Sequence, residues 1–335
     1  MTENLMMHRR QLVLAAFTAA MGSGAALGVT TDAHAQAANY PAGVIRIIVP
    51  FTPGSGSDTS ARFFGERISK ALGQGVIVEN RPGANGVIGL QAVKNQPADG
   101  YTVLLASNSP IAVNPLVLKD LPYDPLTDFK PVHGLTRGMN VFIVSTESPY
   151  KTFGDLLTAA HQKSLTMGTY SAGYELAGQW LAELSGSRQF TNVPYKGQAP
   201  IVTDIMGNHQ LDFALVDLGG AIEQIRGGKL RALAVSGENR NPDLPDVPTV
   251  REQGFKDYVQ YSWVSFYVRM QTPDDIVAKL ASAVQQAMST EDARQFVHSH
   301  GGELMDYSTQ EMTRFHRAEI ERFRKIAEKA GIKPR

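Results

Sequence analysis

A short loop rich in glycine and serine carries the clearest chemical signal in this chain. Residues 52–58 read Thr-Pro-Gly-Ser-Gly-Ser-Asp and join the apolar run 44–49 to a helical pattern that begins near Thr59. Such a loop directs free backbone N–H groups, and the positive end of the helix dipole, at whatever lies above it. Gly54 and Gly56 would allow close approach, so a carboxylate or phosphate is the ligand that suits the loop best.

The loop alone does not specify a ligand. No Gly-Lys-Ser/Thr follows it, and Thr59 stands where a dinucleotide-binding loop has its third glycine, so nucleotides are disfavoured. Many strand-to-helix turns also need glycine for geometry alone. Asp58 has two interpretations: as a helix N-cap it would accept from the N–H of Ser60 or Ala61, whereas an exposed carboxylate would favour a ligand with a hydrogen-bond donor.

The first 35 residues predict export. Arg9 and Arg10 precede the weakly apolar run 12–29, and Ala-His-Ala at 33–35 fits a signal peptidase site. We expect a signal peptide over 1–35, cleaved after Ala35, because glycine, serine and threonine make the run a poor membrane span. Paired arginines also resemble a twin-arginine signal, so the general secretory and twin-arginine routes both stay open.

Composition narrows the class of protein. The 335 residues include 32 basic and 32 acidic ones, and the predicted signal peptide removes two of each, which gives no reason to expect nucleic acid or anionic lipid as a partner. The chain has no cysteine, which excludes disulfides, thiol catalysis and cysteine-ligated metals. Its length and 43% hydrophobic content allow a large core and two domains.

Strand-like runs alternate with helical patterns, which predicts an α/β fold with largely parallel sheets. A second strand, small-residue loop and helix lies at 165–181; if its loop faces the first, a ligand would be held between two lobes. Ser308 and Glu311 form a capping box for a helix over 309–330, whose apolar stripe we expect to be core. The predicted strands are 44–49, 76–79, 101–106, 141–144, 211–216, 232–235 and 264–268; the stripe is Met312, Phe315, Phe323, Ile326 and Ala327.

Further motifs along the chain resemble a known family, the tripartite tricarboxylate transporter receptors, also called Bug proteins. The motifs occur in the order that the family shows, and together they span residues 40–335. They are Pro-Phe-Thr-Pro-Gly-Ser-Gly-Ser-Asp from Pro50, Val-Glu-Asn-Arg-Pro-Gly-Ala-Asn-Gly from Val78, Ala-Asp-Gly-Tyr-Thr from Ala98, Pro-Tyr-Asp-Pro from Pro122, Val-Pro-Tyr-Lys-Gly from Val193, Gly-Lys-Leu-Arg-Ala-Leu-Ala-Val from Gly228, Leu-Pro-Asp-Val-Pro-Thr from Leu244 and Ala-Gly-Ile-Lys-Pro from Ala330.

The resemblance implies a periplasmic solute receptor with a two-lobed Venus-flytrap fold, similar to type II periplasmic binding proteins. It implies lobe one at 40–138 plus 262–335 and lobe two at 139–261. It also implies a monomer that binds a small carboxylate, without cofactor, metal or catalytic residues, and delivers it to a membrane permease of one large and one small subunit. Carried over by position, the ligand-binding residues would be Phe51, Thr52, Pro53, Gly54, Ser55, Gly56, Ser57, Asp58, Ser107, Asn108, Tyr170, Ser171, Ala172, Gly173, Tyr174 and Asp217.

The chain departs from the family pattern near the expected ligand. The second loop is about two residues shorter than usual and carries Tyr170 and Tyr174. These rings could stack on an aromatic acid such as terephthalate, or could face the hinge or solvent. Asp217 begins Asp-Leu-Gly-Gly, where the family commonly has Asp-Asn and Pro-Ser. A carboxylate there would repel a second ligand carboxylate, which weighs against a simple dicarboxylate.

Two other functions remain open at this stage. The closed receptor could signal to a membrane histidine kinase instead of feeding a permease. An exported enzyme is the weaker alternative, because no His-Glu-x-x-His, Gly-x-Ser-x-Gly or paired His/Asp metal signature is present. His298 and His300 are two apart and would not share a helix face, so we interpret them as surface residues.

Overall fold

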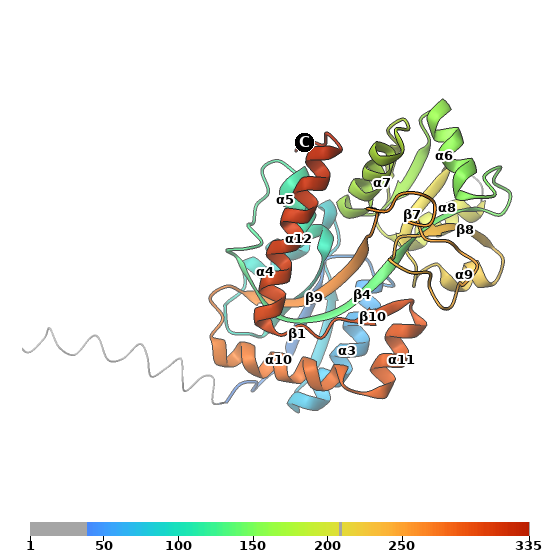
Figure 1. Ribbon diagram of the computed structural model, residues 1–335. Coiled ribbons are helices and arrows are strands. Elements are labelled where there is room, and N and C mark those ends of the chain that lie inside the picture. The colour runs from blue at the N-terminus through green and yellow to red at the C-terminus, as the bar shows by residue number, and fades with distance from the viewer. Residues whose placement is uncertain (1–38, 208–209, 335) are drawn as a thin grey trace, which may run out of the picture. The chain divides into compact units, whose positions relative to one another are not determined.

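The long strand β4 (Phe129–Ser145) connects two halves of one sheet in the computed structural model (Figure 1). Its residues 129–139 pair antiparallel with β9 (Tyr261–Arg269). From Asn140 onward it pairs antiparallel with β7 (Phe213–Asp217) and β8 (Leu230–Val235). The chain therefore changes from one sheet half to the other between two adjacent residues of β4, next to the boundary at 138/139 predicted from the sequence. That boundary stays a prediction.

The structure describes residues 39–207 and 210–334, and residues 43–335 form one compact unit. The predicted signal peptide and its cleavage site lie outside the described residues. The remaining strands are β1 (Ile45–Val49), β2 (Val76–Asn80), β3 (Thr102–Ser107), β5 (Thr166–Thr169), β6 (Thr191–Pro194) and β10 (Gly302–Leu304). The helices are α3 (Gly56–Leu72), α4 (Val87–Lys94), α5 (Asn114–Val117), α6 (Phe153–Gln162), α7 (Ala172–Ser185), α8 (Gln198–Gly207), α9 (Ile222–Arg226), α10 (Asp274–Met288), α11 (Glu291–Ser299) and α12 (Thr309–Lys329), with short turns η1 (Ala84–Gly86) and η2 (Ser109–Val113).

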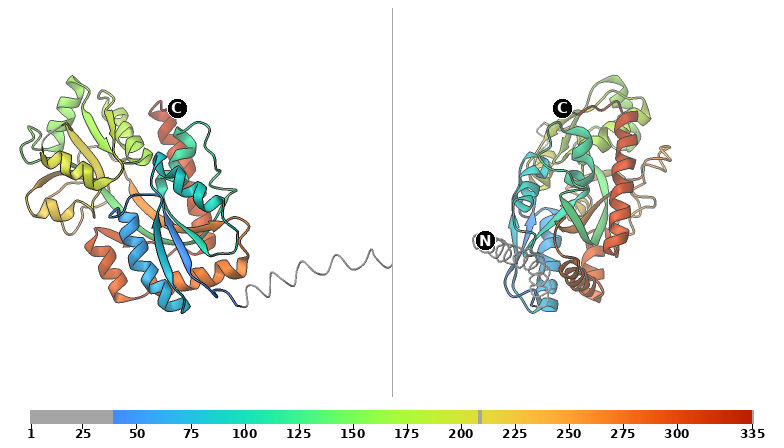
Figure 2. Two further views of the ribbon diagram at one scale, coloured as in Figure 1. Left: turned by 180° about the vertical axis from the view of Figure 1, so that it is seen from behind. Right: turned by 90° about the vertical axis from the view of Figure 1, so that its left-hand side faces the viewer.

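The strand order is β2-β1-β3-β9-β4-β7-β5-β6, with β8 and β10 also paired to β4. Parallel pairs occur within each half, β1 with β2 and β3, and β5 with β6 and β7. The centre of the sheet is antiparallel, so the expectation of largely parallel sheets was only half right. The reason is that β4 takes the chain out of the first half and β9 lies beside it where the chain returns, so these neighbouring strands run in opposite directions. Figure 2 shows the two halves from behind.

Helices cover both halves of the sheet, and their apolar faces form the core. Val141 and Ile143 of β4 pack with Ile201 of α8 and Ile222 of α9 in one hydrophobic cluster. A larger cluster includes residues of β3, α7, β9 and α12. The predicted C-terminal helix is confirmed as α12, with its capping box, and Met312, Phe323, Ile326 and Ala327 are buried while Phe315 packs at the edge.

Candidate functional site

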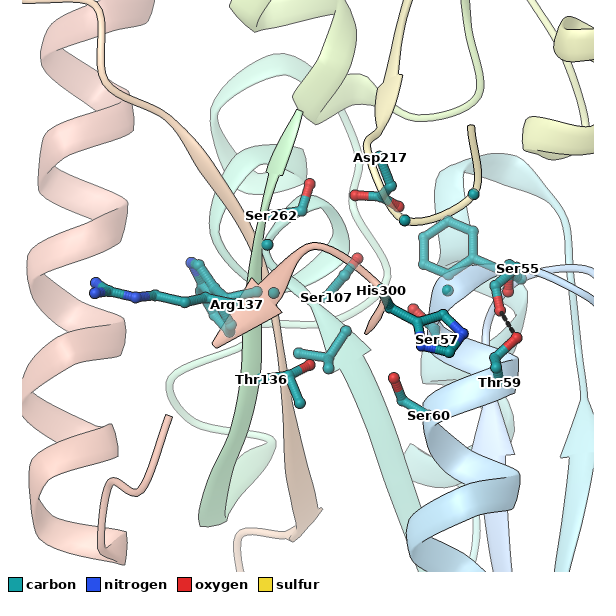
Figure 3. Close-up of a pocket in the computed structure, with 18 of the residues that line it drawn as sticks. Ser55, Ser57, Thr59, Ser60, Ser107, Thr136, Arg137, Asp217, Ser262 and His300 are labelled. Carbon is teal, nitrogen blue, oxygen red and sulfur yellow. Dashed lines mark hydrogen bonds between the residues drawn. The ribbon is translucent and has the colours of Figure 1, made fainter. Parts of the chain in front are cut away.

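A cavity of about 240 Å³ lies where the loops of the two sheet halves meet (Figure 3). The structure brings most of the predicted site residues to its wall. These are Phe51, Gly54, Ser55, Gly56, Ser57, Ser107, Asn108, Tyr170, Ser171, Tyr174 and Asp217. The other predicted residues belong to the same two loops but do not line the cavity: Thr52, Pro53, Asp58, Ala172 and Gly173.

The first loop ends in a helix N-terminus with unused hydrogen-bond donors. Helix α3 begins at Gly56, and its N-cap is Ser55, whose hydroxyl accepts from the Asp58 N–H at 3.2 Å. The N–H groups of Gly56 and Ser57 have no acceptor within the described residues. Both residues line the cavity, so two donors at the positive end of a 17-residue helix are available to an anion.

Asp58 braces this loop from behind. Its carboxylate accepts from the Gly54 N–H at 2.9 Å and from the Asn80 amide at 3.0 Å, and it pairs with Arg62 at 3.0 Å. Neither interpretation of Asp58 is confirmed, because Ser55 is the N-cap and the Asp58 side chain is buried. Burial raises the pKa of Asp58, but the hydrogen bonds from Gly54, Arg62 and Asn80 outweigh it and hold the pKa below its ordinary value.

Gly54 is required by backbone conformation. Its φ is 80°, in the left-handed region, and a Cβ built on it would meet no atom within 4 Å. Gly54 therefore serves the turn, and the expectation that it lets a ligand approach closely stays a prediction. Gly56 is the glycine that lies against another side chain, since its Cβ would lie 3.6 Å from Oδ2 of Asp217.

The second loop is held by residues of the opposite wall. Helix α7 has Ser171 as its N-cap, but the Ser171 hydroxyl lies 2.8 Å from the Ser109 hydroxyl and makes no cap hydrogen bond. Ser109 also accepts from the Gly173 N–H at 3.1 Å. These contacts join η2 of one sheet half to α7 of the other, across the cavity.

Tyr170, Tyr174 and Asp217 form a hydrogen-bonded cluster on the cavity wall. Tyr170 donates to Oδ2 of Asp217, and the two tyrosine hydroxyls are 2.9 Å apart. The Tyr174 hydroxyl lies 3.0 Å from that of Ser262. The Tyr170 ring also meets Phe51 of the first loop edge-on, with centroids 6.1 Å apart. Burial, and then the charge of Asp217, raises the pKa of both tyrosines well above its ordinary value, so both hydroxyls stay protonated.

Several residues of the wall were not predicted. Arg137 and Gly138 come from the crossing strand β4, Ser262 and Trp263 from β9, and His300 follows α11. His300 is exposed, as expected, yet it also borders the cavity. No motif marks these residues, because they reach the cavity only through the pairing of β4 with β9 and β10. Gly219 and Gly220 also line the cavity, and for these two the sequence does carry a signal, because they follow Asp217 within three residues.

Within residues 39–207 and 210–334, no group of three or more histidine, aspartate or glutamate side chains is arranged to hold a metal ion. In the same part of the chain, no helix is both long and apolar enough to cross a membrane.

Residues 60–332 match the family model for the tripartite tricarboxylate transporter family receptor. The chain belongs to this family. Among solved structures, it resembles Rpa4515 of R. palustris with adipate, at 32% identity and a TM-score of 0.83, covering 88% of this chain and 100% of that one. It also resembles the periplasmic binding protein BugD, at 27% identity and a TM-score of 0.83 with the same coverage.

A third similar structure is MatC from Rhodopseudomonas palustris with bound malate, at 26% identity and a TM-score of 0.80, covering 86% of this chain and 99% of that one. These neighbours are two-lobed α/β solute-binding proteins, and this chain has their fold. The family is one of periplasmic receptors, and two of the neighbours carry small carboxylates. This protein is a receptor of that family.

Proposed function

We propose that this receptor captures one small carboxylate between its first and second loops and delivers it to a membrane permease of one large and one small subunit. The observation that supports this most strongly is the pair of unused N–H groups, Gly56 and Ser57, at the cavity. Adipate and malate in the similar structures support a carboxylate as the ligand.

The proposal includes the finer organisation of the chain. Lobe one comprises residues 40–138 with 262–335, and lobe two comprises 139–261. The change of pairing partner at Asn140 supports this division. The mature protein begins after Ala35, acts in the periplasm as a monomer and does not alter its ligand.

A ligand screen tests this function. The mature protein is heated with aliphatic di- and tricarboxylates, amino acids and aromatic carboxylates including terephthalate, and each hit is measured by calorimetry. A true ligand at a concentration well above its dissociation constant should raise the melting temperature by about a few degrees. An aromatic hit would support the interpretation based on Tyr170 and Tyr174. Recovery of each ligand unchanged after long incubation tests the absence of catalysis, and no shift with any carboxylate would refute the proposal.

A backbone substitution tests the anion site itself. Gly56→Pro removes one unused N–H at the first position of α3, where proline is well tolerated, and Ser55 before it is already extended at φ −69° and ψ 158°. We expect carboxylate affinity to fall about tenfold, as for one charge-assisted hydrogen bond. Gly56→Ala is the matched control, because it adds a Cβ and keeps the N–H. Equal affinity of the two variants would show that this N–H does not bind the ligand.

The destination of the ligand needs a cellular test. Deleting the gene should abolish uptake of the identified ligand if the receptor feeds a permease. Loss of induction with intact uptake would instead indicate signalling to a membrane histidine kinase.

A further inference from the structure

Asp217 lies on the cavity wall without a cationic partner. No lysine, arginine or histidine among the described residues forms an ion pair with it, and the groups that donate to its carboxylate are neutral tyrosine hydroxyls, with Tyr170 donating to Oδ2. Arg137 also lines the cavity, but its guanidinium pairs with Glu303 at 2.8 Å and lies over the Tyr261 ring at 5.0 Å. Figure 3 shows this side chain directed away from Asp217. The cavity therefore contains an uncompensated carboxylate.

The hydroxyl protons around Asp217 can be assigned by counting. A carboxylate only accepts, so Tyr170 donates to Asp217. The contact between the two tyrosines at 2.9 Å then needs the proton of Tyr174, and the contact of Tyr174 at 3.0 Å needs the proton of Ser262. The hydroxyls of Tyr170, Tyr174 and Ser262 therefore all donate in the direction of Asp217.

The side-chain amide of Asn140 completes this assignment of hydrogen-bond donors. Its side chain lies 2.7 Å from the Ser262 hydroxyl through the atom placed as Oδ1, while the buried atom placed as Nδ2 has no partner. Oxygen and nitrogen of an asparagine amide are assigned from their hydrogen bonds. Exchanging the two lets the amide donate to Ser262, whose proton is then free for Tyr174. The amide thus starts a chain of donors that ends at Asp217, so this wall offers the ligand acceptors only.

The wall around Asp217, which we call the acceptor wall, lies next to the first loop, which we call the donor loop because of its unused N–H groups. Oδ2 of Asp217 lies 3.6 Å from the Cβ position of Gly56, in the first turn of α3. The unused N–H groups of Gly56 and Ser57 belong to the same turn. A ligand carboxylate on these donors would therefore have the Asp217 carboxylate as its neighbour. Like charges so close disfavour each other unless a cation lies between them.

We propose that Asp217 binds an ammonium group of the ligand, on a carbon next to the carboxylate held by the first loop. The ligand class is thus an amino acid, whose anionic and cationic ends match the donor loop and the acceptor wall. This inference rests on the proposed function and narrows it. Adipate and malate, the ligands of two similar structures, carry no ammonium group, so they are not the class that this inference predicts here.

Three ligands with one carbon skeleton test the inference. Succinate, malate and L-aspartate differ only in carrying hydrogen, hydroxyl or ammonium at the carbon next to one carboxylate, and glutarate, 2-hydroxyglutarate and L-glutamate form a longer set. Glycine, L-alanine and L-phenylalanine extend the test to amino acids without a second carboxylate. Calorimetry on the mature protein should give the tightest binding with an ammonium-bearing member.

Asp217→Asn removes the charge and keeps an oxygen that Tyr170 can donate to. We expect affinity for the best amino acid to fall at least about thirtyfold, because the ammonium loses its charged partner. Affinity for the ligand without nitrogen should stay equal or rise. Asp204→Asn is the matched control, since Asp204 also accepts from a tyrosine, Tyr195, and does not line the cavity. It should leave every affinity unchanged.

The outcomes separate the inference from the proposed function. Tight binding of plain dicarboxylates, with no preference for the amino acids and no change in Asp217→Asn, would overturn the inference and leave a carboxylate receptor. Binding of no carboxylate at all would overturn both. An unchanged melting temperature of ligand-free Asp217→Asn would show that lost affinity does not come from misfolding.

Discussion

The two loops at the cavity are stabilised in different ways. The first is braced by side chains of its own sheet half: Ser55 caps α3, and Asp58 holds Gly54, Asn80 and Arg62. The second relies on the opposite half, because Ser171 and Gly173 both bond to Ser109. The first loop is therefore formed whether or not the halves approach each other, whereas the second gains its hydrogen bonds to Ser109 only when the halves meet. One half of the site is preorganised, and the other depends on closure.

Blocking closure should have the largest effect on binding. Gly219 precedes α9, and a Cβ at this residue would lie 2.4 Å from the His300 carbonyl oxygen of the other half. Gly219→Val should weaken ligand binding up to about 100-fold, since relieving such an overlap costs up to about 3 kcal/mol. Calorimetry with the best ligand measures the loss. The melting temperature without ligand should stay the same, because the overlap arises only between the halves.

A second glycine provides the control for this effect. Gly154 is exposed in α6, and its Cβ would make an ordinary contact of 3.7 Å. Gly154→Val should bind ligand like the unmodified protein. If Gly219→Val also binds normally, the contact with His300 does not form in the ligand-bound state.

Removing the brace of the first loop should affect folding. Asp58→Ala leaves the Gly54 N–H without its acceptor, removes one of the two acceptors of the Asn80 amide, and takes away the carboxylate that pairs with Arg62. We expect a loss of about 2 kcal/mol in the free energy of unfolding, and a melting temperature lower by about 4 °C. Asp155→Ala is a milder comparison, because the hydrogen bonds by which that carboxylate caps α6 are exposed to solvent.

The effect of Asp58 should also depend on pH. Its pKa is lower in the folded protein than the ordinary 3.8, so the carboxylate stabilises the fold above that pH. This contribution is lost as the pH falls below 3.8 through the folded-state pKa. The difference in unfolding free energy between the parent and Asp58→Ala should therefore be full at pH 7 and shrink below about pH 4. A difference independent of pH would mean that Asp58 acts by packing alone.

The same contrast explains which parts of the site the sequence could reveal. The first loop is local: strand, glycines, serines and helix follow one another in the chain, and α3 with its donors could be expected from them. The sequence did not identify the N-cap, because Ser55 and Asp58 are both good capping residues; in the structure Ser55 caps α3 while Asp58 accepts from the Gly54 N–H. The tyrosines of the second loop were expected at the ligand, but the hydrogen bonds that orient their hydroxyls come from Asp217 and Ser262, far away in sequence.

The crossing strand shows most clearly what sequence patterns miss. Only 141–144 of β4 has an apolar run, whereas its first part contains Pro131, Gly134 and Gly138 and does not look like a strand. Gly134 is explained only by tertiary structure, since a Cβ there would lie 2.4 Å from the carbonyl oxygen of Met305. Wall residues contributed by this strand and its partners therefore could not be predicted from local pattern.

The smallest effect that we expect isolates the hydrogen bonds of closure. Ser109→Ala removes the hydroxyl that pairs with Ser171 and accepts from the Gly173 N–H. Because these bonds join the two halves, their loss should weaken ligand binding about fivefold, equivalent to about 1 kcal/mol, and leave the ligand-free melting temperature unchanged. Ser164→Ala is the control, as its hydroxyl bonds to Gln189 within one half. If Ser109→Ala lowers the ligand-free melting temperature instead, the halves already touch without ligand, and the second loop is as preorganised as the first.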